Sequence, residues 1–254
     1  MNTPNPPQYV HTEDVMGTVV SFDVRGASDP RPAVADACAW LRRVDTTFST
    51  YRPTSEISLI NRGELRLRDA SDDVREVIER CAELRDKTRG AFDAEITGTL
   101  DPSGYVKGWA AERAASILER HRLRHFQINA GGDIVVRGDA HPNAGWRLGV
   151  RHPDLSDSLI AVVSLRDAAI ATSGEYERGH HVHCSGAHAR AQLLLSVTVT
   201  ARDLGTADAW ATAILAWGRD GLDLLADAPP DLEALAVLED TTVQTPGFPQ
   251  LVSD

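Results

Sequence analysis

The sequence predicts an α+β fold, in which packed helices cover a mixed, largely antiparallel sheet within a single domain. Apolar residues recur at helical spacing in the first half of the chain and again after residue 205, whereas short apolar runs separated by Gly, Asp and Pro fill the middle. Helices and strands are therefore segregated along the chain, unlike the regular alternation of a βαβ winding. No repeat or linker divides the 254 residues. We expect one domain over residues 15–254, preceded by a flexible arm over residues 1–14.

The first half of the chain is expected to contain one strand and three helices. The run MGTVVSFDV at 16–24 alternates between apolar and polar residues, as a strand does. Residues 32–49 carry apolar side chains at helical spacing behind a proline that suits a first helical turn. A second helix opens at Ser71 and stops before the turn TRGAFD at 88–93, and a third follows the segment DPSG, which begins at Asp101.

The second half of the chain is expected to supply most of the sheet. Clusters of Gly, Asp and Pro separate six short strand-like runs, at 125–129, 133–138, 146–151, 159–165, 168–173 and 193–201. The remaining expected elements are a helix at 206–218, an acidic helix at 220–228 and a strand at 234–240.

The composition is that of a globular protein with an acidic surface. The formal net charge is −11, and the sequence pI is about 5.2. A field of that sign disfavours nucleic acid and anionic membranes as partners, so an anionic ligand needs a local cation or aimed backbone N–H groups. The three cysteines are too few and too scattered for a disulfide framework, and neither a leader sequence nor a membrane-spanning run is evident. We expect a cytoplasmic protein without a membrane anchor.

The pair Asp208 and Thr212 is a candidate metal site. Residues four apart on a helix share one face, and a carboxylate with a hydroxyl supplies two oxygen ligands for a hard cation such as Mg²⁺. A structural explanation also stands, because Asp complements the dipole in a first helical turn and Thr bonds back to a carbonyl.

Lys107 is mildly anomalous in the first turns of its helix, where a cation opposes the helix dipole. A bound anion such as a phosphate explains it, and so does a side chain extending into solvent. The paired glycines of NAGGD at 129–133 permit close approach of backbone to a ligand, although a plain hairpin turn explains them equally well. No helix follows them, so a dinucleotide-binding motif is unsupported.

The stretch ERGHHVHCSGAHA at 177–189 holds four of the nine histidines and one cysteine. A zinc site is the direct alternative hypothesis for it. The spacing is too compact for the usual tetrahedral sets of Cys and His. Its candidate ligands are His180, His181, His183, Cys184 and His188.

Seven stretches, in this order, resemble the ApbE-type flavin transferases, which are FAD:protein FMN transferases. The resemblance implies a single-domain α+β enzyme that binds FAD and Mg²⁺, moves FMN to a Thr or Ser of an acceptor protein, and releases AMP. Hydrolysis of FAD to FMN and AMP, or FAD binding without chemistry, are the alternatives. The matching stretches are MGT (16–18), FSTYRPTSEISLIN (48–61), TRGAFD (88–93), DPSGYVKGWAAERA (101–114), NAGGDI (129–134), AIATSGEYER (169–178) and SVTVTARDLGTADAWATAILAWG (196–218).

The resemblance also implies roles for individual residues. The positions that match FAD contacts are Met16, Tyr51, Ala91, Phe92, Asp93, Asp101, Lys107 and Val182. The positions that match the metal site are the carbonyl of Gly104 and the side chains of Asp208 and Thr212, with Ala211 beside them. Lys107 would also supply a second cation near the phosphates during catalysis.

Two departures from the family pattern concern the site. Only seven residues separate Asp93 from Asp101, where many members carry a long insertion that helps to cover the flavin. In the H-I-I-D-P loop of the family, His181 matches the histidine, whereas Cys184 and Ser185 replace the aspartate and the proline. His181, or else His183, is the candidate base, since an unperturbed histidine titrates near neutral pH.

Overall fold

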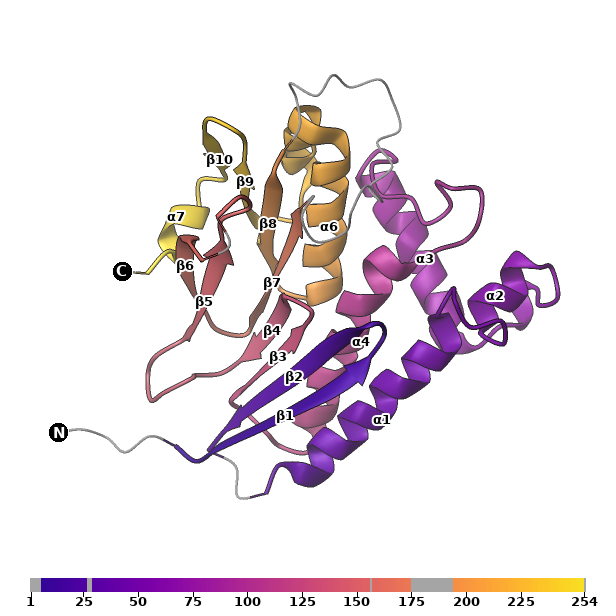
Figure 1. Cartoon of the computed structure of the whole chain (residues 1–254), viewed down its shortest axis with the longest axis horizontal. Helices are drawn as coiled ribbons and strands as arrows, with labels where there is room; N and C mark the ends of the chain where they lie inside the picture. The colour runs from indigo at the N-terminus through magenta and orange to yellow at the C-terminus, as the bar shows by residue number, and fades with distance from the viewer. Residues whose placement is uncertain (1–5, 27–28, 156, 175–193, 254) are drawn as a thin grey trace.

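The computed structural model describes residues 6–26, 29–155, 157–174 and 194–253 (Figure 1). Among the helices of these segments, none combines the length and the apolar character needed to cross a bilayer. The elements, in chain order, are β1 (Gln8–Val15), β2 (Thr18–Arg25), α1 (Arg31–Phe48), α2 (Glu56–Asn61), η1 (Leu67–Asp69), α3 (Asp72–Lys87), α4 (Ser103–Arg120), β3 (Phe126–Ala130), β4 (Asp133–Arg137), β5 (Trp146–Arg151), β6 (Leu159–Leu165), β7 (Ala168–Gly174), β8 (Ser196–Ala201), α6 (Leu204–Trp217), η3 (Gly218–Asp227), β9 (Glu233–Val237), β10 (Thr242–Gln244) and α7 (Phe248–Leu251).

The central feature is an eight-stranded sheet with the order β1-β2-β3-β4-β7-β8-β9-β10. Each neighbouring pair in it is antiparallel, so the α+β prediction with a largely antiparallel sheet is confirmed. The strands β5 and β6 leave this order and form a separate two-stranded sheet. Hairpin turns join β1 to β2 and β3 to β4, and because β2 and β3 are antiparallel neighbours these two turns lie at the same end of the sheet.

The expected flexible arm over residues 1–14 is wrong for its second half, because Gln8–Val15 form the edge strand β1. This strand pairs with β2 along its whole length, from Gln8 opposite Arg25 to Val15 opposite Thr18. Alternate residues of β1 are half-buried, but Tyr9, His11 and Glu13 occupy those positions. Polar side chains on the inward face conceal the apolar alternation by which a strand is recognised in a sequence.

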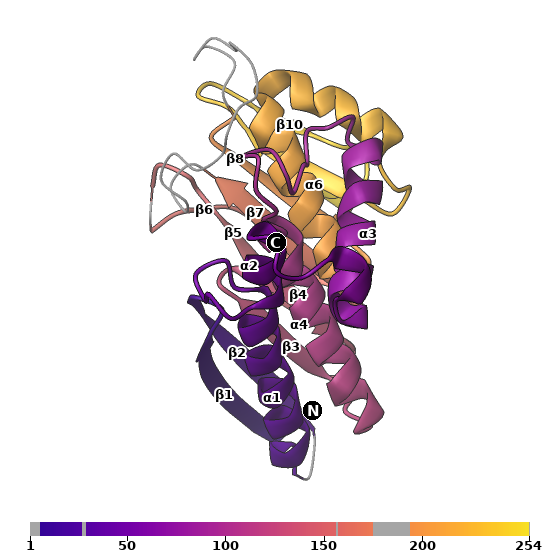
Figure 2. The same cartoon turned by 90° about the vertical axis from the view of Figure 1, so that its right-hand side faces the viewer.

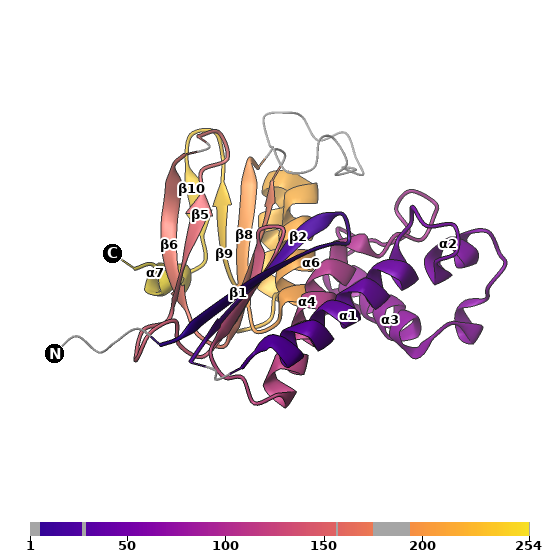
Figure 3. The same ribbon diagram turned by 60° about the horizontal axis from the view of Figure 1, so that its bottom comes forward.

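Helices α1, α4 and α6 cover one face of the large sheet (Figures 2 and 3). Helix α6 packs on β7 and β8, α4 on β3 and on α6, and α1 on α4 and β1. Two glycines allow α4 and α6 to approach closely. A Cβ atom on Gly108 would lie 2.6 Å from the carbonyl oxygen of Leu204, and one on Gly205 would lie 2.6 Å from the ring of Tyr105. The contact of these helices determines the position of the side chains discussed below.

The opposite face of the large sheet carries β5, β6 and α7, which gives the molecule three layers (Figure 3). Trp146 and Leu148 of β5 pack there with Val136 of β4, Leu235 of β9 and Phe248 of α7 in a second apolar core. The β5–β6 hairpin therefore closes the back of the sheet, on the side away from the helices.

Most expected elements are present, with shifts of one to three residues at their ends. The acidic helix expected at 220–228 is instead the 3-10 segment η3. Its start is fixed by Gly218, which has a φ of 59°, and by Gly221, where a Cβ would lie 2.2 Å from the carbonyl oxygen of Ile214. The short elements α2, β10 and α7 were not anticipated.

Candidate active site

Helix α6 positions the predicted pair Asp208 and Thr212. The helix begins after Asp203, whose side chain accepts a hydrogen bond of 2.8 Å from the backbone N–H of Thr206. Asp208 is 1% exposed, and Thr212 is half-buried one turn later. The hydroxyl of Thr212 lies 3.2 Å from that of Ser173 at the end of β7. The two predicted oxygen ligands therefore share one helix face that is turned toward the sheet.

Lys107 of α4 joins this face from the neighbouring helix. Its ammonium lies 3.7 Å from Oδ2 of Asp208 and forms an ion pair with Oδ2 of Asp133. The Lys107 side chain is 22% exposed, whereas each of the two carboxylates is 2% exposed. The structure thus gives an interior partner to a lysine whose place in the helix was anomalous in the sequence.

Asp133 was missed as a site residue by sequence reasoning. It begins β4 directly after the Gly131–Gly132 turn, and its Oδ1 accepts a hydrogen bond of 3.1 Å from the backbone N–H of Thr172 in β7. An acidic residue at the first position of a buried strand, inside the NAGGDI stretch, was the available signal. Its partner in α4 lies 26 residues earlier, so the pairing depends on the tertiary fold.

The charged residues of this cluster, which we call the carboxylate–lysine cluster, are Lys107, Asp133 and Asp208. In this cluster one ammonium lies beside two buried carboxylates, so oxygen donors gather at a single point in the interior. Gly104 lies one helical turn before Lys107, and its carbonyl keeps a second lone pair beyond the helical hydrogen bond. Carboxylate, hydroxyl and carbonyl oxygens are the ligands that Mg²⁺ and Ca²⁺ prefer, so these residues fit a hard divalent cation.

Ala211 is fully buried on α6 and supplies no side-chain donor. Its place between Asp208 and Thr212 is consistent with a backbone or packing role. A larger side chain at this fully buried position would have to displace its neighbours.

The turn that contains Met16 lies next to the turn that leads to Asp133. Met16 and Gly17 both have positive φ, of 55° and 71°. The backbone N–H of Gly131 donates to the carbonyl oxygen of Val19 at 3.2 Å, and a Cβ on Gly131 would collide with Thr18. Met16 therefore lies in a tight turn with positive φ. This turn is at the same end of the sheet as Asp133, the first residue of β4.

The turn at 88–93 is held from within by Thr88. Its hydroxyl donates to the carbonyl of Leu84 at 2.7 Å and accepts from the backbone N–H of Phe92 at 3.0 Å. Ala91 and Phe92 are buried, and a Cβ on Gly104 would lie 3.3 Å from the Phe92 ring. The structure therefore brings the predicted Ala91–Phe92 turn against the first turn of α4.

The two predicted acidic contacts, Asp93 and Asp101, lie at the end of this turn and after it. Each accepts a hydrogen bond from a backbone N–H two residues later. Asp93 accepts a hydrogen bond of 2.9 Å from the backbone N–H of Glu95, and its other oxygen lies 3.3 Å from Nε of Arg85. Asp101 is exposed and accepts a hydrogen bond of 3.0 Å from the backbone N–H of Ser103, at the start of α4. Both side chains are ordered by local hydrogen bonds of the kind that Asp forms in turns.

The chain before Asp101 is anchored by Asn61, another residue that sequence reasoning did not single out. Its side-chain amide donates to the carbonyl of Leu100 and accepts from the N–H of Leu100, each at 2.8 Å. Tyr51 precedes α2, and its side chain is 96% exposed, so its ring contacts little of the described protein. An exposed tyrosine ring is available to a ligand, but it is not fixed by packing.

The remaining predicted site residues lie outside the described residues. They are the candidate base His181, its neighbour His183, the FAD contact Val182, the replaced positions Cys184 and Ser185, and the other members of the hypothetical zinc set, His180 and His188.

The fold and the carboxylate–lysine cluster define an α+β protein with a buried charged site where two helices meet the sheet. The model of the ApbE family matches residues 16–99 and 97–236. Those two segments cover most of the chain, and the protein therefore belongs to the ApbE family.

Curated relatives resemble the chain at modest identity. The FAD:protein FMN transferase of Treponema pallidum (strain Nichols) is 30% identical over 164 residues, which cover 57% of this chain and 45% of that protein. The FAD:protein FMN transferase of Vibrio cholerae serotype O1 is 26% identical over 139 residues, which cover 51% of this chain and 42% of that protein. The matched segments therefore span less than half of the length of either relative.

Solved structures resemble the chain over nearly its whole length. The flavin transferase ApbE from Vibrio cholerae has a TM-score of 0.79 at 21% identity, covering 97% of this chain and 99% of that one. The ApbE protein from Thermotoga maritima has a TM-score of 0.85 at 23% identity, covering 98% and 100%. These likenesses show that the fold is shared.

Proposed function

We propose that this protein is a Mg²⁺-dependent FAD:protein FMN transferase that moves FMN from FAD to a Thr or Ser of an acceptor protein. The observation that carries the proposal is the carboxylate–lysine cluster, in which Lys107 lies between Asp133 and Asp208. Membership of the ApbE family and the names of the relatives support this reaction class. The acceptor hydroxyl oxygen forms a bond to the FMN phosphorus, the bond from that phosphorus to the bridging oxygen breaks, and AMP leaves.

The proposed metal ligands are the carboxylate of Asp208, the hydroxyl of Thr212 and the carbonyl of Gly104, with Ala211 beside them on α6. Their carboxylate, hydroxyl and carbonyl oxygens are the donors that Mg²⁺ prefers. Bound Mg²⁺ would neutralise charge on the pyrophosphate oxygens.

Lys107 is proposed to bind the phosphates of FAD and to stabilise the negative charge that grows on the leaving AMP. Asp133 is proposed to position it, because a buried carboxylate holds the flexible four-carbon side chain in one place. A lysine fixed in advance needs less reorganisation when charge develops, and this preorganisation is the main source of electrostatic catalysis.

The other FAD contacts are proposed from the family match. Met16 and the Ala91–Phe92 turn lie on rigid turns, while Asp93 and Asp101 are oriented by local hydrogen bonds. Tyr51 offers an exposed aromatic face that suits stacking on a flavin or an adenine ring. Val182 is proposed to contact FAD on the basis of the sequence match alone.

His181 is proposed as the base that accepts the proton of the acceptor hydroxyl, on the basis of its place in the sequence. Cys184 stands where the family carries an aspartate. The loop aspartate that the family places near the reacting phosphate is thus replaced by a thiol, so we expect transfer by this protein to be slow relative to members that keep the aspartate.

Product analysis tests the proposal. The protein is incubated with FAD, Mg²⁺ and candidate acceptor proteins that contain an exposed Thr or Ser, and AMP and the acceptor mass are measured. We expect equal amounts of AMP and flavinylated acceptor, both of which require Mg²⁺. Release of free FMN without flavinylation would identify a hydrolase, and intact FAD with every acceptor would refute catalysis.

A further inference from the structure

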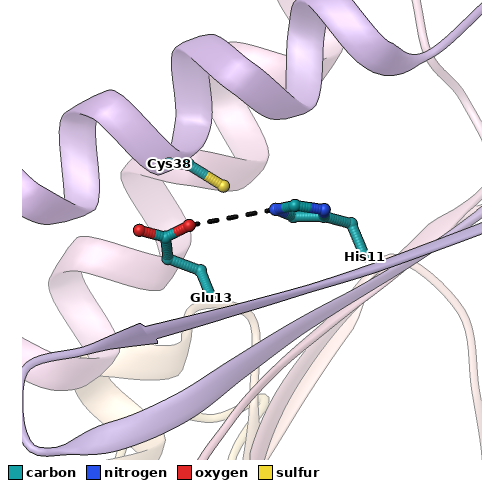
Figure 4. Close-up of side chains that lie close together, drawn as sticks. All are labelled: His11, Glu13 and Cys38. Atoms are coloured by element: carbon teal, nitrogen blue, oxygen red, sulfur yellow. Dashed lines mark ion pairs between the residues drawn. The ribbon is translucent and has the colours of Figure 1, made fainter.

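A second group of potential metal ligands lies between the edge strand β1 and helix α1, apart from the carboxylate–lysine cluster. It consists of His11 and Glu13 on β1 and Cys38 on α1 (Figure 4). One ligand atom from each residue lies within 4.8 Å of the other two. A nitrogen, an oxygen and a sulfur donor are therefore close enough to one another to be candidate ligands of a single ion.

The fold dictates this convergence. His11 and Glu13 are two residues apart on a strand and so extend from the same face, which is the half-buried face toward α1. Cys38 is 2% exposed on the buried face of α1. The His11 ring is stacked with Tyr9 at a centroid distance of 6.5 Å and packs on Phe22 at 6.3 Å. Ring contacts on two sides orient the imidazole toward Glu13 and Cys38.

We propose that His11, Glu13 and Cys38 form a Zn²⁺ site that joins β1 to α1. This donor set is the borderline combination of imidazole, carboxylate and thiolate that Zn²⁺ accepts, whereas Mg²⁺ and Ca²⁺ prefer oxygen ligands alone. Three protein ligands leave the fourth tetrahedral position to a water molecule. On binding, a Zn–S bond forms at Cys38 and the thiol proton is released to solvent.

The charges around the group are compatible with a divalent cation. Glu13 accepts hydrogen bonds from Nε and Nη2 of Arg42, at 2.6 and 3.0 Å, and Arg42 holds the pKa of that carboxyl below its ordinary value. Its Oε2 also lies 3.9 Å from Nε2 of His11. Arg42 engages both carboxylate oxygens, so a metal at Glu13 would have to displace one of these two hydrogen bonds; the Arg42 side chain is 60% exposed and can turn into solvent.

Cys38 is a thiol when no cation is bound. Burial, together with the negative charge of Glu13, raises its pKa to about 11. A cation between the two residues would reverse that effect and stabilise the thiolate. The site does not depend on the proposed flavin chemistry, but Glu13 lies only three residues before Met16, so a bound ion would stiffen the strand that leads into the Met16 turn.

Cobalt substitution tests the proposal, because Co²⁺ occupies tetrahedral zinc sites and a thiolate ligand gives a charge-transfer band. Untagged protein is stripped with a chelator and titrated with Co²⁺, and Zn²⁺ is then added. We expect a thiolate–Co²⁺ band that saturates at one ion per chain and disappears when Zn²⁺ displaces the cobalt. Absence of the band in folded wild-type protein would overturn the proposal.

Matched cysteine variants assign the thiolate. The band should vanish in Cys38→Ser and persist in Cys184→Ser and Cys81→Ser; Cys81 is a buried thiol on α3 and serves as the control. Persistence of the band in Cys38→Ser would overturn the assignment. Loss of the band in Cys184→Ser would move the thiolate ligand to the histidine-rich stretch at 177–189. His11→Ala provides a second variant, since this side chain is 37% exposed. It should weaken Zn²⁺ binding by more than the roughly 100-fold cost of losing an outer-shell partner, and unchanged affinity would contradict the site.

Discussion

The ammonium of Lys107 lies 3.7 Å from the carboxylate of Asp208, across the interface of α4 and α6. The same ammonium pairs with Asp133 of β4, so a single cation joins two helices and the sheet. Because both carboxylates are almost fully buried, the position of Lys107 is determined by charge as well as by packing.

Lys107 and Asp133 should be strongly coupled in stability. Removing one partner leaves the other buried with an unbalanced charge. Removing both abolishes that imbalance between the two residues, while Asp208 loses its lysine equally in Lys107→Met and in the double variant. In a double-mutant cycle with Lys107→Met and Asp133→Asn, we expect a coupling free energy of about 1–3 kcal/mol in the free energy of unfolding. Urea unfolding of the four proteins measures it, and additive single effects would show that the ion pair contributes nothing.

Gly108→Ala should separate α4 from α6. Alanine normally stabilises an open helical position relative to glycine by about 1 kcal/mol. Here the new Cβ would lie 2.6 Å from the backbone oxygen of Leu204, so we expect a loss of about 1–3 kcal/mol instead. Thermal unfolding reports the change, with Ser116→Ala on the same helix as the control. A variant as stable as the wild type would show that the helix contact tolerates an expansion.

Local features of the site were predictable from the sequence, and tertiary ones were not. Asp208 and Thr212 share a helix face because their spacing is a property of one element. Lys107 was identified as anomalous for its position, but its partner Asp133 lies on a strand that reaches it only through the packing of α4 on the sheet. The contact between the Phe92 ring and Gly104 was likewise not predictable from the sequence. It joins the turn at 88–93 to the first turn of α4, and neither element alone determines that contact.

The fold follows the same division. Helix α3 was placed from Ser71, which caps it through a hydrogen bond to Val74 N–H, because capping is a local interaction. Strand β1 was missed because its inward positions hold polar and aromatic side chains, which are tolerated at the edge of a sheet beside α1. The same polar side chains are the ones proposed to bind Zn²⁺, so the feature that concealed the strand is also its functional signal.

Glu112 should make stability depend on pH in the acid range. Burial raises the pKa of this carboxyl above its ordinary value of 4.5, although its ion pair with Arg137 opposes the shift. A raised folded-state pKa means that the native state binds more protons than the unfolded state, so the contribution of Glu112 falls as pH rises through 4.5 toward the folded value. The wild type should therefore gain stability relative to Glu112→Gln on acidification from pH 7 to pH 5.

Chemical unfolding at several pH values measures that difference. Glu119→Gln serves as the control for loss of an Arg137 partner at the surface, because Glu119 also pairs with that guanidinium, at 3.1 Å. If the wild type instead gained stability relative to Glu112→Gln as the pH rose from 5 to 7, the sign would be opposite to the prediction. That result would refute the buried-carboxyl explanation.

Thr212→Val should weaken Mg²⁺ binding, because it removes one proposed oxygen ligand while keeping the shape of the side chain. Loss of one polar partner costs about 1–3 kcal/mol, which corresponds to a roughly 5- to 150-fold higher Mg²⁺ concentration for half-maximal AMP release. Thr212→Ser keeps the hydroxyl and should remain near the wild type. Equal Mg²⁺ dependence in the Val and Ser variants would exclude Thr212 as a ligand.

Asp208 is proposed to hold the cation that permits cleavage of FAD, and AMP release from FAD by Asp208→Asn tests that role most directly. The assay is run with and without Mg²⁺, beside wild type and the surface variant Asp223→Asn on η3, with thermal unfolding to confirm that each variant is folded. We predict that wild type and Asp223→Asn release AMP only with Mg²⁺, and that Asp208→Asn is slower by roughly 100- to 1000-fold. Mg²⁺-dependent release at the wild-type rate by folded Asp208→Asn would contradict the account.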